Sequence, residues 1–101
     1  MYVTKRINLY MNLSINKITE NKFEVKIYGN SVTVHQVIIS DDIYLRLTNS
    51  KISKEKLLEF SFAFLLERES NASILTSFDL QVISKYFSNY EHEVRSFIDS
   101  L

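Results

Sequence analysis

The chain has 101 residues, of which 46% are apolar and 13% aromatic, and this is enough to build the core of a single domain over residues 1–101. Twelve basic and twelve acidic side chains cancel, so no overall charge attracts nucleic acid or a membrane surface. The absence of cysteine excludes disulfides and favours a cytoplasmic location, and a single glycine excludes the glycine-rich loops that bind phosphates or dinucleotides.

The first predicted element is a strand. Apolar and polar residues alternate from Ile7 to Ile15, which is the period of a half-buried strand. Two interpretations of residues 1–10 remain: an edge strand of the domain, or an extension that precedes a translation start at Met11. As an edge strand, this segment would offer unpaired backbone groups to a second copy, so a homodimer is one expected form of the protein.

A β-hairpin is predicted next. Phe23, Val25 and Ile27 alternate with charged residues, and Gly29-Asn30 separates them from further apolar residues. Because a two-residue hairpin loop needs positive φ, the only glycine predicts a primed turn at Gly29-Asn30. The resulting cross-strand pairs are Ile27 with Val32, Val25 with Val34, and Glu24 with His35 on the outer face.

The alternation of this second strand fails beyond Val34. Gln36 would lie on the apolar face, and residues 37–39 are all apolar. Either a bulge near His35 and Gln36 or burial of both faces of the strand resolves the conflict.

Helical patterns fill the rest of the chain. An acidic cap at residues 40–42 predicts a short helix that ends near Asn49, and Ser53 caps a strongly apolar helix over about residues 54–69. A third helix is predicted to begin at Ser77 or Asp79, and a fourth follows Ser88 or Asn89. Ile74 and Leu75 are expected to pack under the central helix. These patterns predict an α+β fold, with an antiparallel sheet of two or three strands packed against three to four C-terminal helices.

Chemical motifs are scarce. Glu91-His92-Glu93 is the only local cluster that resembles a metal or proton-transfer site, and helical spacing turns His92 away from the apolar stripe of its helix, toward solvent. His35 opposite Glu24 is expected to be a surface pair. We therefore predict no catalytic, metal-binding or cofactor-binding residue, no cofactor and no enzymatic activity.

One stretch resembles a family of small uncharacterised bacterial and cyanobacterial proteins. The resemblance covers about residues 22–94 and rests on Leu65-Leu66-Glu67-Arg68-Glu69, Ser73-Ile74-Leu75, Phe78-Asp79-Leu80, Ile83, Tyr86-Phe87 and Tyr90-Glu91. The family places prolines where this chain has Ser70 and Ser88. The resemblance implies a strand hairpin followed by helices, and it implies no activity.

A second likeness is to ribbon-helix-helix DNA-binding proteins. Over residues 33–69 the predicted order is a strand, an acidic cap, a short helix and a longer apolar helix. This likeness implies a dimer whose paired strands enter the major groove, with Thr33 and His35 as the contacting residues.

Our main prediction is a non-catalytic protein-interaction or regulatory module with an unidentified protein partner. The alternative is a ribbon-helix-helix-like dimeric DNA-binding regulator, although nucleic acid is disfavoured as a partner, and no membrane association is expected.

Overall fold

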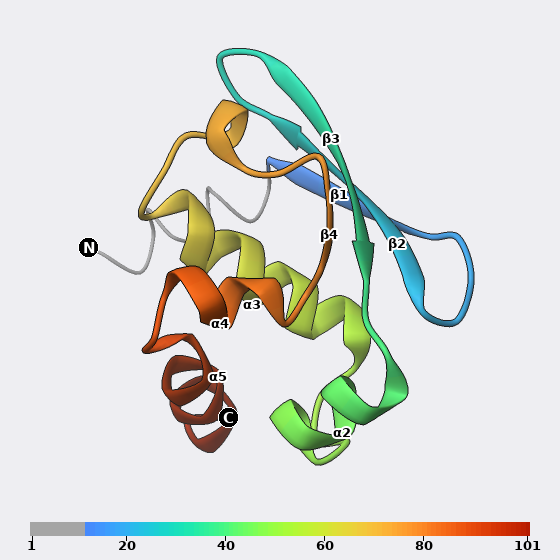
Figure 1. The fold of residues 1–101 in the computed structure, drawn as a ribbon, viewed down its shortest axis with the longest axis vertical. Helices are drawn as coiled ribbons and strands as arrows, with labels where there is room; N and C mark the ends of the chain where they lie inside the picture. Colours follow the sequence, from blue (N-terminus) through green and yellow to red (C-terminus); the bar gives the residue numbers. More distant parts are fainter. Residues whose placement is uncertain (1–11) are drawn as a thin grey trace.

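A computed structural model describes residues 12–101 and shows an α+β fold (Figure 1). In chain order the elements are β1 (Leu13–Lys17), β2 (Lys22–Tyr28), β3 (Val32–Ile38), α2 (Asp41–Thr48), α3 (Lys54–Leu66), the 3₁₀ turn η1 (Asn71–Ser73), β4 (Ser77–Asp79), α4 (Val82–Tyr86) and α5 (Tyr90–Asp99). The predicted α+β class is thus confirmed, but the sheet has four strands where two or three were predicted. The part of the predicted first strand at residues 7–11 lies outside the described residues.

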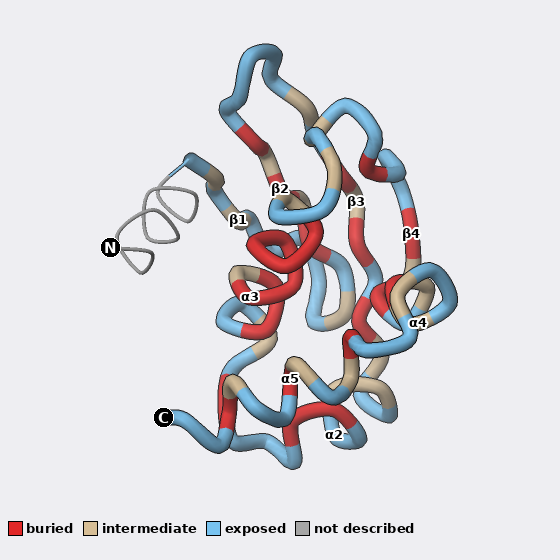
Figure 2. Tube along the Cα trace, turned by 90° about the vertical axis from the view of Figure 1, so that its left-hand side faces the viewer, coloured by how far each residue is buried: buried red, intermediate tan, exposed pale blue. Residues whose placement is uncertain are grey.

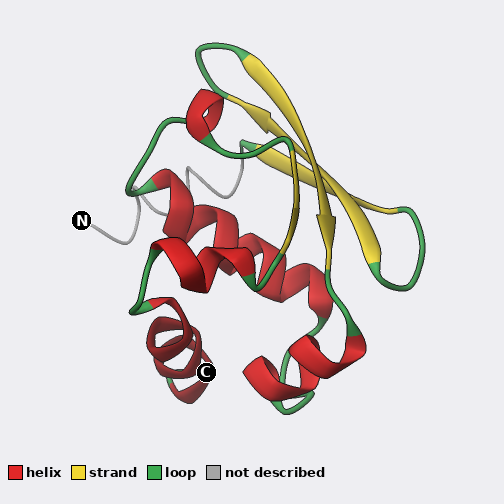
Figure 3. Cartoon of the chain, in the orientation of Figure 1, coloured by secondary structure: helices red, strands yellow, loops and turns green. Residues whose placement is uncertain are grey.

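The four strands form one mixed sheet in the order β1-β2-β3-β4 (Figure 3). β1, β2 and β3 are antiparallel, as predicted, whereas β4 is parallel to β3. The predicted third helix forms as α4, but its predicted start at Ser77 or Asp79 is wrong, because these residues belong to β4. Backbone hydrogen bonds to β3 explain the difference: Gln36 N donates to Thr76 O at 2.8 Å, and Leu80 N donates to Ile38 O at 2.9 Å.

The predicted register between β2 and β3 is wrong by one residue. Tyr28 pairs with Val32 and Val25 pairs with His35, so the loop has three residues, 29–31. A shift of one residue moves every side chain of a strand to the opposite face. His35 and Val37 consequently lie in the core, and Val32 is 58% exposed. No bulge is needed, because the new register already places Val37 on the apolar face.

Gly29 serves close packing in this loop and does not adopt the predicted positive φ. A Cβ atom at this position would lie 3.1 Å from Oδ1 of Asn71. The Asn71 amide nitrogen donates to Ser31 O and to the Thr33 hydroxyl, each at 3.0 Å. The glycine therefore lets a side chain from η1 bind the end of the hairpin.

The helix caps follow the prediction closely. The Ser40 hydroxyl accepts a hydrogen bond from Ile43 N at the start of α2, and the Ser53 hydroxyl accepts one from Lys56 N at the start of α3. These bonds satisfy amide groups that the first turn of a helix leaves unpaired. α2 ends at Thr48 and is capped by Asn49, whose φ is 52°. α3 ends at Leu66, three residues before the predicted end.

α3 is the central element of the core, as predicted, and eight of its 13 residues are buried (Figure 2). Its phenylalanines point in two directions. The Phe62 ring faces the sheet, with centroids 5.6 Å from His35 and 6.1 Å from Phe78. On the other side, the Phe64 ring lies 5.3 Å from Tyr90, and Phe60 stacks on Phe97 at 4.7 Å. Hence α3 joins the β layer to α5.

A buried polar pair also connects α3 to α5. The Ser61 hydroxyl donates to Leu57 O at 2.7 Å and lies 2.6 Å from the Tyr90 hydroxyl. Because the serine proton is already used, Tyr90 is the donor to Ser61. Burial raises the pKa of the Tyr90 hydroxyl, which stays neutral in the folded protein.

Glu91 links three helices on the surface. Its carboxylate accepts from Arg46 Nη1 of α2 at 2.7 Å and from the Ser84 hydroxyl of α4 at 3.0 Å. The Arg46 hydrogen bond lowers the pKa of Glu91 below its ordinary value of 4.5.

We expect Glu91→Gln to lower the free energy of unfolding by about 0.5 to 1 kcal/mol at neutral pH. A carboxyl with a lowered folded pKa stabilises the fold above its unfolded pKa, and this stabilisation disappears as the pH falls through the folded value. The deficit of the variant should therefore shrink as the pH falls below 4.5, where Glu91 of the unfolded chain is protonated before Glu91 of the folded protein. Urea unfolding at pH 7 and pH 3 measures both effects, with Glu93→Gln as the control. A deficit that is unchanged at about pH 3 would contradict the ionic origin of the contact.

The second face of the sheet is exposed. The residues that alternate with the core positions of β2 and β3 lie on it, and the apolar ones among them are Tyr28, Val32, Val34 and Ile38. Lys22 and Lys26 are their cross-strand neighbours. This face, named here the outer face, therefore mixes charged and apolar side chains.

Candidate binding pocket

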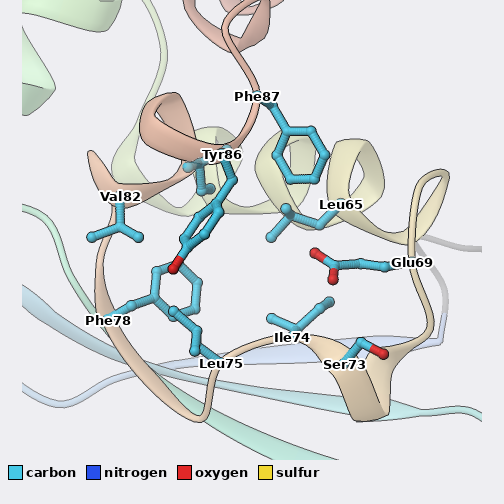
Figure 4. Close-up of a pocket in the computed structure, with 10 residues that line it drawn as sticks. Leu65, Glu69, Ser73, Ile74, Leu75, Phe78, Val82, Tyr86 and Phe87 are labelled. Atoms are coloured by element: carbon cyan, nitrogen blue, oxygen red, sulfur yellow. The ribbon is translucent and has the colours of Figure 1, made fainter.

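A hollow of about 260 Å³ lies where four segments of the C-terminal half meet (Figure 4). These segments are the end of α3, the stretch from η1 to Leu75, β4 and α4. Its inner wall consists of buried or half-buried apolar side chains: Leu65, Ile74, Phe78, Ile83 and Phe87. The hollow therefore opens to solvent, and its floor is formed by side chains of the core.

Two apolar side chains at this pocket are unusually exposed. Tyr86 is 69% exposed and Leu75 is 48% exposed, and both line the hollow. The prediction that Ile74 and Leu75 pack together under α3 is therefore confirmed for Ile74, which is buried, and wrong for Leu75. Exposed apolar groups around a hollow are typical of binding surfaces.

His35 holds the segment that carries Leu75. Its Nδ1 lies 2.7 Å from Leu75 O, and its Nε2 lies 2.9 Å from the Thr33 hydroxyl. A carbonyl can only accept, so Nδ1 carries the proton, and Nε2 accepts from Thr33. The Thr33 oxygen in turn accepts from the Asn71 amide at 3.0 Å. This buried network fixes both ends of the stretch 71–75 against β3.

The pocket contains one charged side chain among the described residues that line it, Glu69. Figure 4 shows its carboxylate pointing into the hollow between Leu65 and Ile74. Within residues 12–101 the Glu69 side chain has no hydrogen bond or ion pair, unlike its neighbour Arg68, which donates to Phe64 O at 2.7 Å. Glu69 is thus an unpaired carboxylate beside apolar walls.

The structure places the predicted DNA-contacting residues elsewhere than expected. His35 is fully buried and faces Phe62, so its predicted outward orientation is wrong because of the register shift. Thr33 is half-buried and bound to His35 and Asn71. Moreover, β3 pairs with β2 along its whole length and with β4 over residues 36–38, so one edge and part of the other are not open to the intermolecular strand pairing of a ribbon-helix-helix dimer.

The cluster Glu91-His92-Glu93 does not form a site. His92 is exposed, as predicted, and Glu91 is bound to Arg46 and Ser84. Across residues 12–101 no group of three or more histidine or acidic side chains is placed to bind a metal ion. None of the helices in this described part of the chain combines the length and apolar character that a membrane span requires.

Comparisons with known proteins return no matching family model, no matching curated protein and no matching solved structure. The pocket therefore has to be interpreted from its own geometry. Sequence reasoning missed the pocket because its walls come from four separate segments, and no local pattern in the sequence marks them.

Proposed function

We propose that this chain is a non-catalytic protein-interaction module, located in the cytoplasm, whose pocket receives one side chain of a partner protein. The observation that carries the proposal is the apolar hollow with exposed Tyr86 and Leu75 around it. Pockets for drug-sized ligands span about 300 to 1,000 Å³, so a hollow of about 260 Å³ suits a single side chain better.

The energetics favour such an anchor. Burying one large apolar side chain stabilises a complex by about 1.5 to 3 kcal/mol. Exposed aromatic residues beside a pocket add contact area at a small entropic cost, and Tyr is enriched among the residues that dominate binding energy. Tyr86 is placed for this role.

The chemistry of the lining favours binding over catalysis. Acid-base mechanisms need titratable groups whose environments separate their pKa values. The residues that line the pocket include one carboxylate, Glu69, and no histidine.

Site-specific crosslinking tests the proposal. We expect a chain in which Tyr86 is replaced by the photo-crosslinker p-benzoylphenylalanine to form an adduct with a second polypeptide in cells of the source organism, identified by mass spectrometry. The matched control carries the same group in place of Val34, which is 39% exposed on the outer face of the sheet. Equal adducts from both positions, or none from position 86, would contradict the proposal. An adduct formed only between copies of this chain would make the pocket a homodimer interface.

A further inference from the structure

We infer that the side chain bound in this pocket is a lysine or arginine of the partner protein. Its alkyl stem would lie against the apolar walls and its cationic head would reach Glu69. The inference rests on the proposed function and specifies the chemistry of the partner segment.

The carboxylate of Glu69 is the first reason. It points into the hollow and has no partner among the described residues. Glu69 is half-buried, and its carboxylate lies between the apolar side chains of Leu65 and Ile74. A cation bound there is screened less than in an ion pair on an open surface, and the pair is accordingly stronger.

The aromatic side chains of the pocket are the second reason. Figure 4 shows Phe78 and Tyr86 on the side of the hollow opposite Glu69. When the cationic head reaches Glu69, these rings lie against the alkyl stem of the bound side chain. Long basic side chains also bury their methylene stems against apolar surface. One lysine or arginine can therefore use every type of group that the lining offers.

The distribution of charge is the third reason. Residues 54–101, which contain the whole pocket, carry eight acidic and five basic side chains, a net charge of minus three. Residues 1–53 carry the compensating plus three, so the excess of acidic side chains favours a basic partner segment only locally, near the pocket.

Titration with fragments of the two side chains tests the inference, with binding followed by the amide chemical shifts of Leu75, Val82 and Tyr86. The probes are n-butylammonium and n-propylguanidinium, and 1-butanol is a neutral probe of matched length. We expect both cations to bind about fivefold tighter than 1-butanol at low salt. This preference should disappear in Glu69→Gln and persist in Glu93→Gln, which removes a carboxylate outside the pocket.

The outcomes separate the inference from the proposed function. Equal binding of the cations and 1-butanol to the wild type would overturn the cationic anchor, while the pocket would remain an apolar binding site. A cation preference that survives in Glu69→Gln would overturn the role of this carboxylate. If no probe shifts the pocket resonances, both the inference and the pocket as a side-chain receptor are wrong.

Discussion

Replacing Phe62 by alanine should lower the free energy of unfolding by about 3 to 5 kcal/mol, the largest effect we expect of any single substitution considered. The Phe62 side chain is fully buried and lies against His35 of β3 and Phe78 of β4. Removing the ring would leave a cavity between α3 and the sheet, and both the lost burial and the cavity destabilise the fold.

Urea unfolding followed by circular dichroism measures this effect. The free energy of unfolding of domains of this size is about 5 to 15 kcal/mol. The variant therefore keeps a small margin of stability, and we expect it to unfold at a lower temperature than the wild type. The control is Tyr86→Ala, which removes an aromatic ring that is 69% exposed and should change stability by less than about 0.5 kcal/mol. A loss below about 1 kcal/mol in Phe62→Ala would contradict the central position of α3.

The sequence predicts α3 and its cap because the relevant information is local. A segment that is apolar on every face has to be buried, and Ser53 marks its start by a hydrogen bond within three residues. The same holds for α2, where Ser40 and Asn49 bound the helix in both the prediction and the structure. Caps and periodicity depend on neighbours in sequence, so they can be recognised from sequence alone.

The elements that sequence reasoning missed depend on distant contacts. Gly29 looks like the signal of a two-residue turn, but its structural partner is Asn71, which no local pattern reveals. β4 has three residues, which are too few to show an alternation. Its hydrogen bonds go to β3, from which it is separated in the sequence by α2 and α3. The pocket could not be predicted for the same reason, because β4 and η1 form two of its walls.

The second large effect is expected for His35→Ala, a loss of about 3 kcal/mol in the free energy of unfolding. The substitution removes a fully buried ring, leaves Leu75 O without its donor, and leaves the Thr33 hydroxyl with Asn71 as its remaining partner. An unsatisfied buried polar group costs about 1 to 3 kcal/mol by itself, and the lost contact with Phe62 adds a cavity term.

His35→Ala also discriminates between the two hairpin registers when it is compared with Val34→Ala. In the structure Val34 lies on the outer face, so its truncation should cost less than about 1 kcal/mol. In the register with a two-residue loop the positions exchange faces, and Val34→Ala would be the more damaging change. Urea unfolding of the two variants decides the question, since a larger loss for Val34→Ala would overturn the register.

Because His35 binds Leu75 O, its removal should also shift the Leu75 amide resonance and weaken probe binding in the pocket. Val34→Ala should show neither effect.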